Sequence, residues 1–259
     1  MEMRGRVAHV TGAAAGIGRA IALRLAAEGA TVVVSDVEES GGRETADRIE
    51  ADGGRAAFIR ADVSSEEAVR AMLAFTEETS GGLDVLVNNA GGAPEPYFPD
   101  ANPGHWIEQV GVNLLGVMLG THYGIEAMRR GGGGAILNIS SRAGIGFTPH
   151  SAPEYAAAKA AVCRFTATLA PLGDLGIRVN CICPDWVETE KIRAERLALG
   201  EEQWAKIAPP KLVHPDAIAV AALRLLTDET LAGRVMLCPH DGEWGLVPVE
   251  DEPRVVPLD

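Results

Sequence analysis

Short runs of apolar residues alternate with longer amphipathic segments along most of the chain. The first apolar run, residues 6–11, precedes a segment from Gly16 to Glu28 in which Ile17, Ile21 and Leu25 recur at helical spacing. This alternation is typical of buried strands joined by helices. Strands with continuous apolar sequence are covered on both faces, so we expect an α/β fold: one doubly wound domain with a parallel sheet and helices on both faces.

The same alternation of apolar runs and amphipathic segments predicts the strands and helices in the rest of the chain. Further strands are expected at residues 31–36, 56–62, 84–91, 134–140 and 178–184. Further helices are expected at residues 39–51, from near Ser64 with Glu67 completing a capping box, through roughly 105–130, and around the sequence YAAAK at 155–159. The charged, helical segment at about 188–212 predicts a lid over a substrate. The tail at about 245–259, rich in proline and acid, is either a frayed end or packs on a neighbouring subunit.

Composition limits the class of protein. The chain has 259 residues, of which 47% are hydrophobic and 23% charged, as in an ordinary globular protein, and we expect residues 1–259 to form a single domain. The formal net charge of -13 argues against a nucleic-acid partner, which would require clustered basic residues. No apolar stretch is long enough for a signal peptide or a membrane helix, so we expect a cytoplasmic protein with no membrane partner.

The four cysteines are Cys163, Cys181, Cys183 and Cys238. Cys181 and Cys183 alternate along an expected strand and would face the same side of the sheet. No second pair of cysteines or histidines lies at metal-ligand spacing nearby. We therefore expect buried, reduced thiols and no metal site.

A glycine-rich turn, TGAAAGIG, joins the first strand to the first helix. Glycines at 12, 16 and 18 let the backbone turn sharply and approach a pyrophosphate at the helix N-terminus. Asp36 ends the second strand, where a carboxylate can accept hydrogen bonds from an adenosine ribose; the alternative is that Asp36 is only a turn residue. The pattern predicts a dinucleotide site.

Asp36 also predicts which dinucleotide binds. Its carboxylate would repel a 2'-phosphate, and neither Ala15 nor Val37 supplies a cation to hold one. We expect NAD to be preferred over NADP, by about tenfold or more in affinity.

Tyr155 and Lys159 stand four positions apart in a run of alanines. On a helix their side chains project from one face about one turn apart. The pair is either functional or two polar residues on an exposed helix. The alanines between them would leave room for a cofactor.

Six motifs in order resemble the short-chain dehydrogenase/reductase family. They are TGAAAGIG, NNAG at 88–91, VNLLG at 112–116, NISS at 138–141, YAAAK at 155–159 and CPDWVET at 183–189. The resemblance implies a Rossmann-like domain that transfers hydride between a nicotinamide and a carbon bearing a hydroxyl or carbonyl. It also implies a homotetramer or homodimer formed through the long helices. Within the family, GVMLGTHYGIEAM, ICPDWVET and LAGRVMLCPHDG look most like the NAD-dependent branch with 15-hydroxyprostaglandin dehydrogenase-like enzymes.

The resemblance assigns catalytic roles to four residues. Tyr155 would be the general acid/base, with a pKa lowered by Lys159 and by the oxidised nicotinamide. Lys159 would also contact the nicotinamide ribose. Asn113 would hold a water in a proton relay, or else bond only to backbone. Ser141, rather than the adjacent Ser140, would hydrogen-bond the substrate oxygen.

The resemblance further implies a set of cofactor contacts. These are Gly12, Gly16, Ile17, Gly18, Asp36, Asp62, Val63, Asn89, Ala90, Gly91, Tyr155, Lys159, Pro184, Val187 and Thr189. Asp185 stands where the family usually has glycine. It is either a tolerated exposed side chain or a carboxylate that favours the cationic, oxidised cofactor.

Together these features predict an NAD-dependent oxidoreductase that interconverts a secondary alcohol and a ketone. The alternative is a non-catalytic, NAD-responsive binding protein with the same fold. A dehydratase or epimerase is disfavoured because the part of the chain after Asp185 is short for a large substrate domain.

Overall fold

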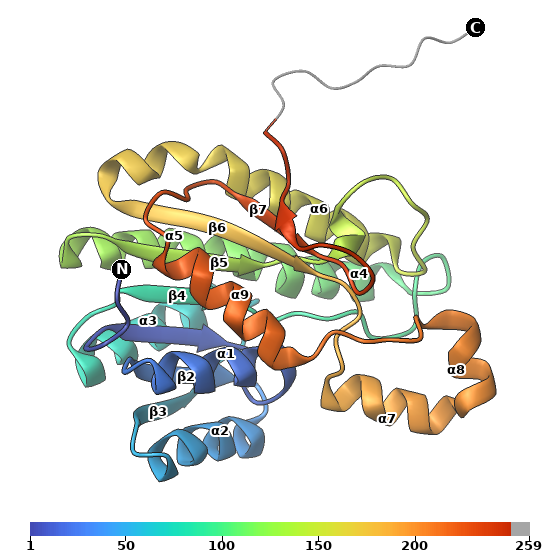
Figure 1. Ribbon diagram of the computed structural model, residues 1–259, viewed down its shortest axis with the longest axis horizontal. Coiled ribbons are helices and arrows are strands. Elements are labelled where there is room, and N and C mark those ends of the chain that lie inside the picture. Colours follow the sequence, from blue (N-terminus) through green and yellow to red (C-terminus); the bar gives the residue numbers. More distant parts are fainter. Residues whose placement is uncertain (250–259) are drawn as a thin grey trace, which may run out of the picture.

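An eight-stranded sheet runs through the molecule in the order β3-β2-β1-β4-β5-β6-β7-β8 (Figure 1). The computed structural model describes residues 1–249. Neighbouring strands from β3 to β7 are parallel, and the short β8 is antiparallel to β7. The strands are β1 (Val7–Thr11), β2 (Thr31–Asp36), β3 (Arg55–Arg60), β4 (Val85–Asn88), β5 (Gly134–Ile139), β6 (Ile177–Pro184), β7 (Val235–Cys238) and β8 (Gly245–Leu246).

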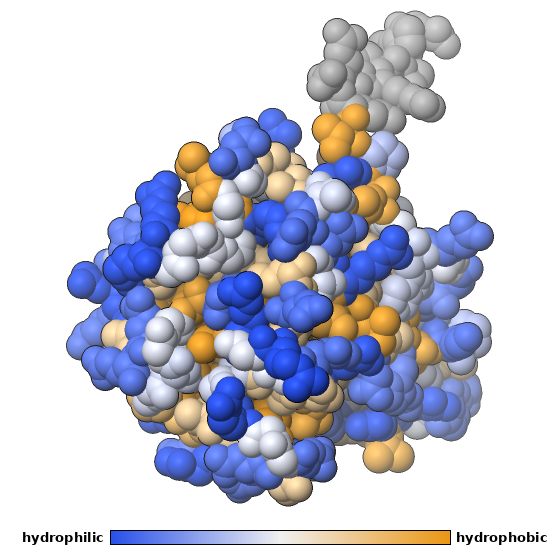
Figure 2. Space-filling view, turned by 60° about the vertical axis from the view of Figure 1, so that its left-hand side comes forward, coloured by the Kyte–Doolittle hydropathy of each residue, from blue (hydrophilic) through white to orange (hydrophobic). Residues whose placement is uncertain are grey.

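Helices cover both faces of this sheet (Figure 1). They are α1 (Gly16–Ala27), α2 (Glu39–Ala51), α3 (Glu66–Ser80), α4 (Pro103–Val110), α5 (Gly116–Gly131), α6 (Pro153–Thr168), α7 (Glu190–Leu199), α8 (Glu201–Ile207) and α9 (Pro215–Thr227). No helix among residues 1–249 combines the length and the apolar character needed to cross a bilayer. Figure 2 shows one outer face, on which hydrophilic residues predominate and hydrophobic ones are interspersed.

Two apolar layers hold the helices to the sheet. On one face, Leu25 of α1 and Leu225 of α9 are buried in the same cluster as Val10 of β1. On the other face, Met72 of α3 and Met128 of α5 share a second cluster. The predicted doubly wound α/β domain is confirmed.

The strand order reverses between β1 and β4. The chain after β1 moves towards β2 and β3, whereas the chain after β4 moves towards β5, β6 and β7. Loops that leave two adjacent parallel strands in opposite directions open a crevice at the carboxyl ends of the strands. The glycine turn after β1 and the NNAG turn at the end of β4 meet there.

The expected continuous helix at 105–130 is interrupted. A π-helical turn, Gly111–Leu115, separates α4 from α5. Within it, Asn113 donates a side-chain hydrogen bond to the Gln109 carbonyl oxygen over 3.0 Å. Such single π turns inside α-helices are frequent at functional sites.

The structure differs from the expected elements at one N-cap and has two strands that the sequence reading did not identify. The N-cap of α3 is Ser65, whose hydroxyl accepts from the Ala68 N–H, while Ser64 hydrogen-bonds Asp62 in the preceding turn. Capping depends on backbone geometry, which the two adjacent serines do not distinguish in sequence. The sheet also extends beyond residue 184, because β7 and β8 pair next to β6. Of the proposed tail, residues 250–259 lie outside the described part.

Candidate active site

The glycine turn is built for close backbone approach. Gly12 and Gly16 have positive φ angles of 63° and 55°, a region that side chains other than glycine seldom adopt. A Cβ on Gly18 would lie 2.3 Å from the Gly12 carbonyl oxygen. Glycine is thus required at each of the three positions.

The N-terminus of α1 fits an anion. Its N-cap, Ala15, has no side chain that accepts from the first-turn N–H groups, and the first turn, which includes Ile17, carries no acid. Unpaired N–H donors at a helix N-terminus attract phosphate groups. The residues present therefore fit the pyrophosphate of a dinucleotide.

Glu190 lies at this same N-terminus. The Gly16 N–H donates to Glu190 Oε2 over 2.9 Å, and Arg19 Nη1 lies 3.7 Å from Glu190 Oε1. A carboxylate of the chain itself therefore occupies a position expected for phosphate oxygens. Sequence reasoning missed Glu190, because it begins α7, far along the chain from the glycine turn.

Asp36 lies at the end of β2 beside the glycine turn. Its Oδ2 accepts from the Ala14 N–H over 2.9 Å, and its Oδ1 accepts from the Glu38 N–H over 3.0 Å. Each carboxylate oxygen keeps a further lone pair that a ribose hydroxyl could use. Arg60, which pairs with Asp36 across the strands and donates to the Val37 carbonyl, is a nearby cation that sequence reasoning did not consider.

Other expected cofactor residues border the crevice. Asn89 donates from its side chain to the carbonyl oxygens of Thr11 and Gly12, and the Ala90 N–H donates to the Thr11 hydroxyl. These bonds fix the turn after β4 against the glycine turn. Asp62 and Val63 follow β3 at the same sheet edge, where the exposed Asp62 carboxylate accepts from Ser64 and Val63 is buried.

The structure brings Tyr155 and Lys159 together on α6. Lys159 Nζ lies 5.5 Å from the centre of the Tyr155 ring and donates to the Ile139 carbonyl oxygen over 3.0 Å. The lysine is only 2% exposed, and burial lowers its pKa to about 8. Lys159 is buried and Tyr155 is partly buried, so the alternative of two polar residues on an exposed helix face is wrong.

The two adjacent serines point to different partners. Ser140 Oγ donates to the Lys159 carbonyl oxygen over 2.7 Å, inside the packing of α6 on the sheet. Burial raises the pKa of Tyr155 above its ordinary value, and hydrogen bonding to Ser141 acts in the opposite direction. Ser141 therefore faces the phenol. The expected lowering of the Tyr155 pKa does not hold for the protein alone, because desolvation outweighs the other contributions.

Asn113 and Lys159 meet at Gly91. A Cβ on Gly91 would lie 2.7 Å from Asn113 Oδ1 and 3.0 Å from Lys159 Nζ. Asn113 is fully buried; its Oδ1 accepts from the Gly92 N–H, and its Nδ2 donates to the Gly92 and Gln109 carbonyl oxygens. One lone pair of Oδ1 is left for a further donor such as water. Both interpretations of Asn113, backbone bonding and a relay, are compatible with this arrangement.

Asp185 is not an exposed side chain. It follows Pro184, the last residue of β6, and its Oδ2 accepts from Arg142 Nη1 over 2.7 Å and lies 2.6 Å from His240 Nδ1. Burial alone would raise the pKa of Asp185, but hydrogen bonds from His240 and Arg142 outweigh burial and lower it. Because Arg142 compensates part of this charge, any preference that Asp185 gives to the oxidised cofactor would be weakened; that hypothesis stays a prediction.

Comparisons with known proteins agree with this geometry. The family model described as short chain dehydrogenase matches residues 6–199. The chain belongs to the short-chain dehydrogenase/reductase family. It is 41% identical over 240 residues to "Short chain dehydrogenase/reductase astE" of Aspergillus oryzae, covering 88% of this chain and 90% of that protein. It is 36% identical over 232 residues to "Cyclohexanol dehydrogenase" of Acinetobacter sp. strain SE19, with the same coverage.

A solved structure supports the same assignment. A short-chain type dehydrogenase/reductase from Mycobacterium marinum superposes with a TM-score of 0.83 at 31% identity, covering 92% of this chain and 96% of that one. This short-chain dehydrogenase is thus an oxidoreductase of a family that uses nicotinamide cofactors and acts on small-molecule alcohols or ketones.

The segment that the sequence predicts to be a lid has a narrow base. Val187 and Val213 form an isolated β-bridge, so the chain leaves the body and returns at one place, and α7 and α8 project from the body between them (Figure 1). Thr189 is the N-cap of α7, and its Cγ2 atom would lie 2.9 Å from a Cβ added to Gly16. The rings of Trp186 and Trp204 meet edge to face with centroids 5.7 Å apart, which anchors α8 to the base.

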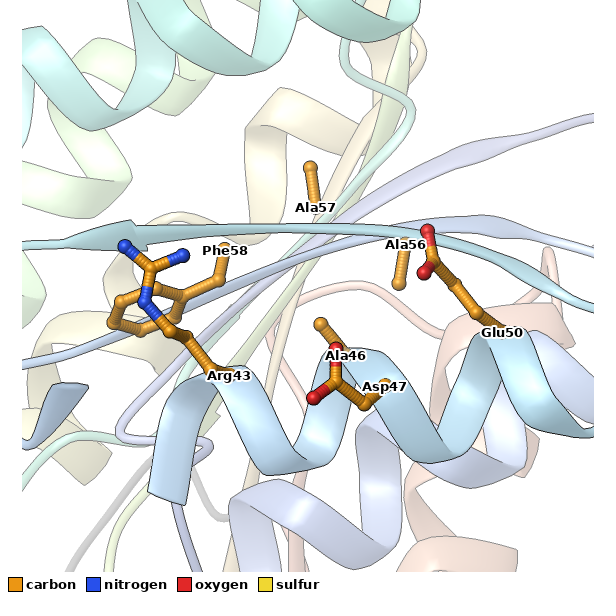
Figure 3. Close-up of a pocket in the computed structure, with 7 residues that line it drawn as sticks. All are labelled: Arg43, Ala46, Asp47, Glu50, Ala56, Ala57 and Phe58. Carbon is orange, nitrogen blue, oxygen red and sulfur yellow. The ribbon is translucent and has the colours of Figure 1, made fainter. Parts of the chain in front are cut away.

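A surface hollow lies elsewhere on this dehydrogenase. It is a shallow cavity of about 200 Å³ between α2 and β3 at the edge of the sheet (Figure 3). Arg43 stacks over Phe58 there, with the guanidinium carbon 5.4 Å from the ring centre. None of the lining residues belongs to the expected site.

Proposed function

We propose that this dehydrogenase oxidises a secondary alcohol to a ketone, or catalyses the reverse reaction, with NAD as its preferred cofactor. The proposal depends most on one observation: the side chains of Tyr155, Lys159 and Ser141 converge where β5 and α6 meet. A protein that only senses NAD would have no use for an acid/base group there.

The nicotinamide, when bound, supplies the acceptor or donor of hydride. Tyr155 takes the proton from the substrate hydroxyl, and the Ser141 hydroxyl orients the substrate oxygen. Lys159 uses one of its three N–H donors on the Ile139 carbonyl oxygen, which leaves two for a cofactor ribose and for a water held by Asn113. Because burial raises the pKa of Tyr155, we expect alcohol oxidation to speed up as the pH rises.

Cofactor binding extends along the crevice. Gly12, Gly16, Ile17 and Gly18 would hold the pyrophosphate, and Asp36 the adenosine ribose. The remaining contacts would come from Asp62, Val63, Asn89, Ala90 and Gly91 towards the adenosine and from Pro184, Val187 and Thr189 towards the nicotinamide.

The reaction is tested with a panel of secondary alcohols that begins with cyclohexanol, following NADH absorbance. Tyr155→Phe should lower kcat by at least about 100-fold while the Kd for NAD stays within a factor of about two. Tyr123→Phe is the control, because the Tyr123 hydroxyl bonds Glu66 at the surface. NAD binding without turnover of any alcohol or ketone would favour the NAD-responsive binding protein instead.

The cofactor preference is tested by titration. We expect NAD to bind at least about tenfold more tightly than NADP, and Asp36→Asn to narrow the difference, because Arg60 then faces the 2'-phosphate without a competing carboxylate. Asp47→Asn on α2 is the control, because it removes one negative charge at a position outside the expected ribose site. Equal affinities of the unaltered protein for both dinucleotides would refute the preference.

Assembly and location complete the proposal. Ile107 of α4 is 72% exposed, and Leu115 of the π turn and Met118 of α5 are also exposed, as a helix-mediated homodimer or homotetramer would require. The cytoplasmic location remains the expectation from the sequence. Light scattering that gives a monomer mass would contradict the assembly.

A further inference from the structure

Three buried thiols converge in the interior. Cys181 and Cys183 are alternate residues of β6 and face the same side of the sheet, where α6 carries Cys163. Cys163 Sγ lies 3.4 Å from Cys183 Sγ, Cys181 Sγ lies 4.0 Å from Cys183 Sγ, and all three sulfur atoms lie within 4.8 Å of one another. Their exposed fractions are 8%, 0% and 0%.

These separations are close to those of metal ligands: the 4.0 Å distance agrees with them, and the 3.4 Å distance requires Cys163 Sγ and Cys183 Sγ to move apart by about 0.4 Å. Zinc–thiolate bonds of about 2.3 Å place the sulfur atoms of a three- or four-coordinate site about 3.8–4.0 Å apart. Thiols that serve only as small apolar groups have no need to meet. Cys238 of β7 is buried to the same degree, and the structure gives it no thiol neighbour.

The surroundings suit a divalent ion. Lys159 lies one helical turn before Cys163 on α6, and Ser140 Oγ lies 3.2 Å from Cys163 Sγ. Three thiolates, one divalent cation and the Lys159 ammonium together carry no net charge, which is the condition for burying such a group at low cost. The Ser140 hydroxyl oxygen would be a candidate for a fourth ligand position.

We propose that Cys163, Cys181 and Cys183 form a binding site for a thiophilic divalent cation of the zinc and cadmium class. The three thiols lose their protons to solvent as the sulfur–metal bonds form. The site is separate from the dinucleotide crevice but shares one turn of α6 with Lys159. The sequence alone did not predict this site, because Cys163 lies on a different element from the other two proposed ligands.

The experiment uses the reduced, metal-free full chain and Cd²⁺ as the probe. Equilibrium dialysis should give one tightly bound Cd²⁺ per chain, and the ultraviolet spectrum should gain a thiolate-to-cadmium charge-transfer band. Cys163→Ser and Cys181→Ser should each weaken binding by at least about 100-fold, because loss of a ligand exceeds the effect of losing a supporting contact. Cys238→Ser should leave both readouts unchanged.

Two further measurements keep the test valid if a variant fails to fold or if Cd²⁺ enters the buried site slowly. The ¹¹³Cd NMR shift of the unaltered protein should fall in the range of three sulfur ligands, which requires no variant. Dialysis after refolding the chain with Cd²⁺ removes any barrier to entry. Absence of the charge-transfer band after refolding, a shift typical of oxygen ligands, or equal loss of binding in Cys238→Ser would each overturn the proposal. None of these readouts depends on dehydrogenase activity.

Discussion

At Gly91 one hydrogen atom occupies the space between two functional side chains. We expect Gly91→Ala to displace Asn113 and Lys159, because the added methyl group would lie 2.7 Å and 3.0 Å from their terminal atoms. The kcat should fall by about 10- to 100-fold, the order expected for displacement of a positioned group by about 1 Å. Gly92→Ala is the matched control, since its Cβ would meet nothing within 4 Å. A similar kcat in both variants would contradict this role of Gly91.

At the scale of elements, α7 reaches across the crevice to α1. Glu190 accepts from the Gly16 N–H, so a dinucleotide pyrophosphate that bound there would have to displace this carboxylate. We expect Glu190→Gln to tighten NAD binding by about two- to fivefold, because an uncharged side chain loses its favourable interaction with the helix N-terminus. Calorimetric titration measures the change. Glu202→Gln on α8, an exposed acid paired with Lys206, controls for net charge. An equal gain in NAD affinity in that variant would contradict this role of Glu190.

At the scale of the whole molecule, one histidine couples folding to pH. His9 of β1 is fully buried between the hydroxyls of Thr76 and Ser35, and burial lowers its pKa to about 3. The unfolded chain binds a proton at His9 below about pH 6.5, whereas the folded chain stays neutral there until about pH 3, so stability falls as the pH decreases through this window.

We expect His9 to reduce the free energy of unfolding by about 2 kcal/mol between pH 7 and pH 5. Urea denaturation at the two pH values measures this change. In His9→Gln the protein should be less stable at pH 7 but lose less on acidification. The exposed His122 provides the control, and a pH slope that His9→Gln and His122→Gln alter equally would contradict the assignment.

The sequence alone determined the layers, most strands, and the positions of the glycine turn and of Tyr155 and Lys159. These follow from local rules: apolar periodicity, the φ angles that only glycine adopts easily, and helical spacing. The π turn at Asn113 and the choice of Ser65 over Ser64 as N-cap depend on backbone geometry that neighbouring residues do not specify.

Only the tertiary structure decided which distant groups meet. Glu190 reaches Gly16, and Arg142 and His240 hydrogen-bond Asp185. Cys163 joins the thiols of β6 because helices cross the sheet and bring remote segments into contact. The tertiary structure also decided that burial raises the pKa of Tyr155 in the protein alone, whereas the expected lowering included the oxidised nicotinamide. Burial depends on the whole packed molecule, and no local pattern encodes how far water is excluded from one phenol.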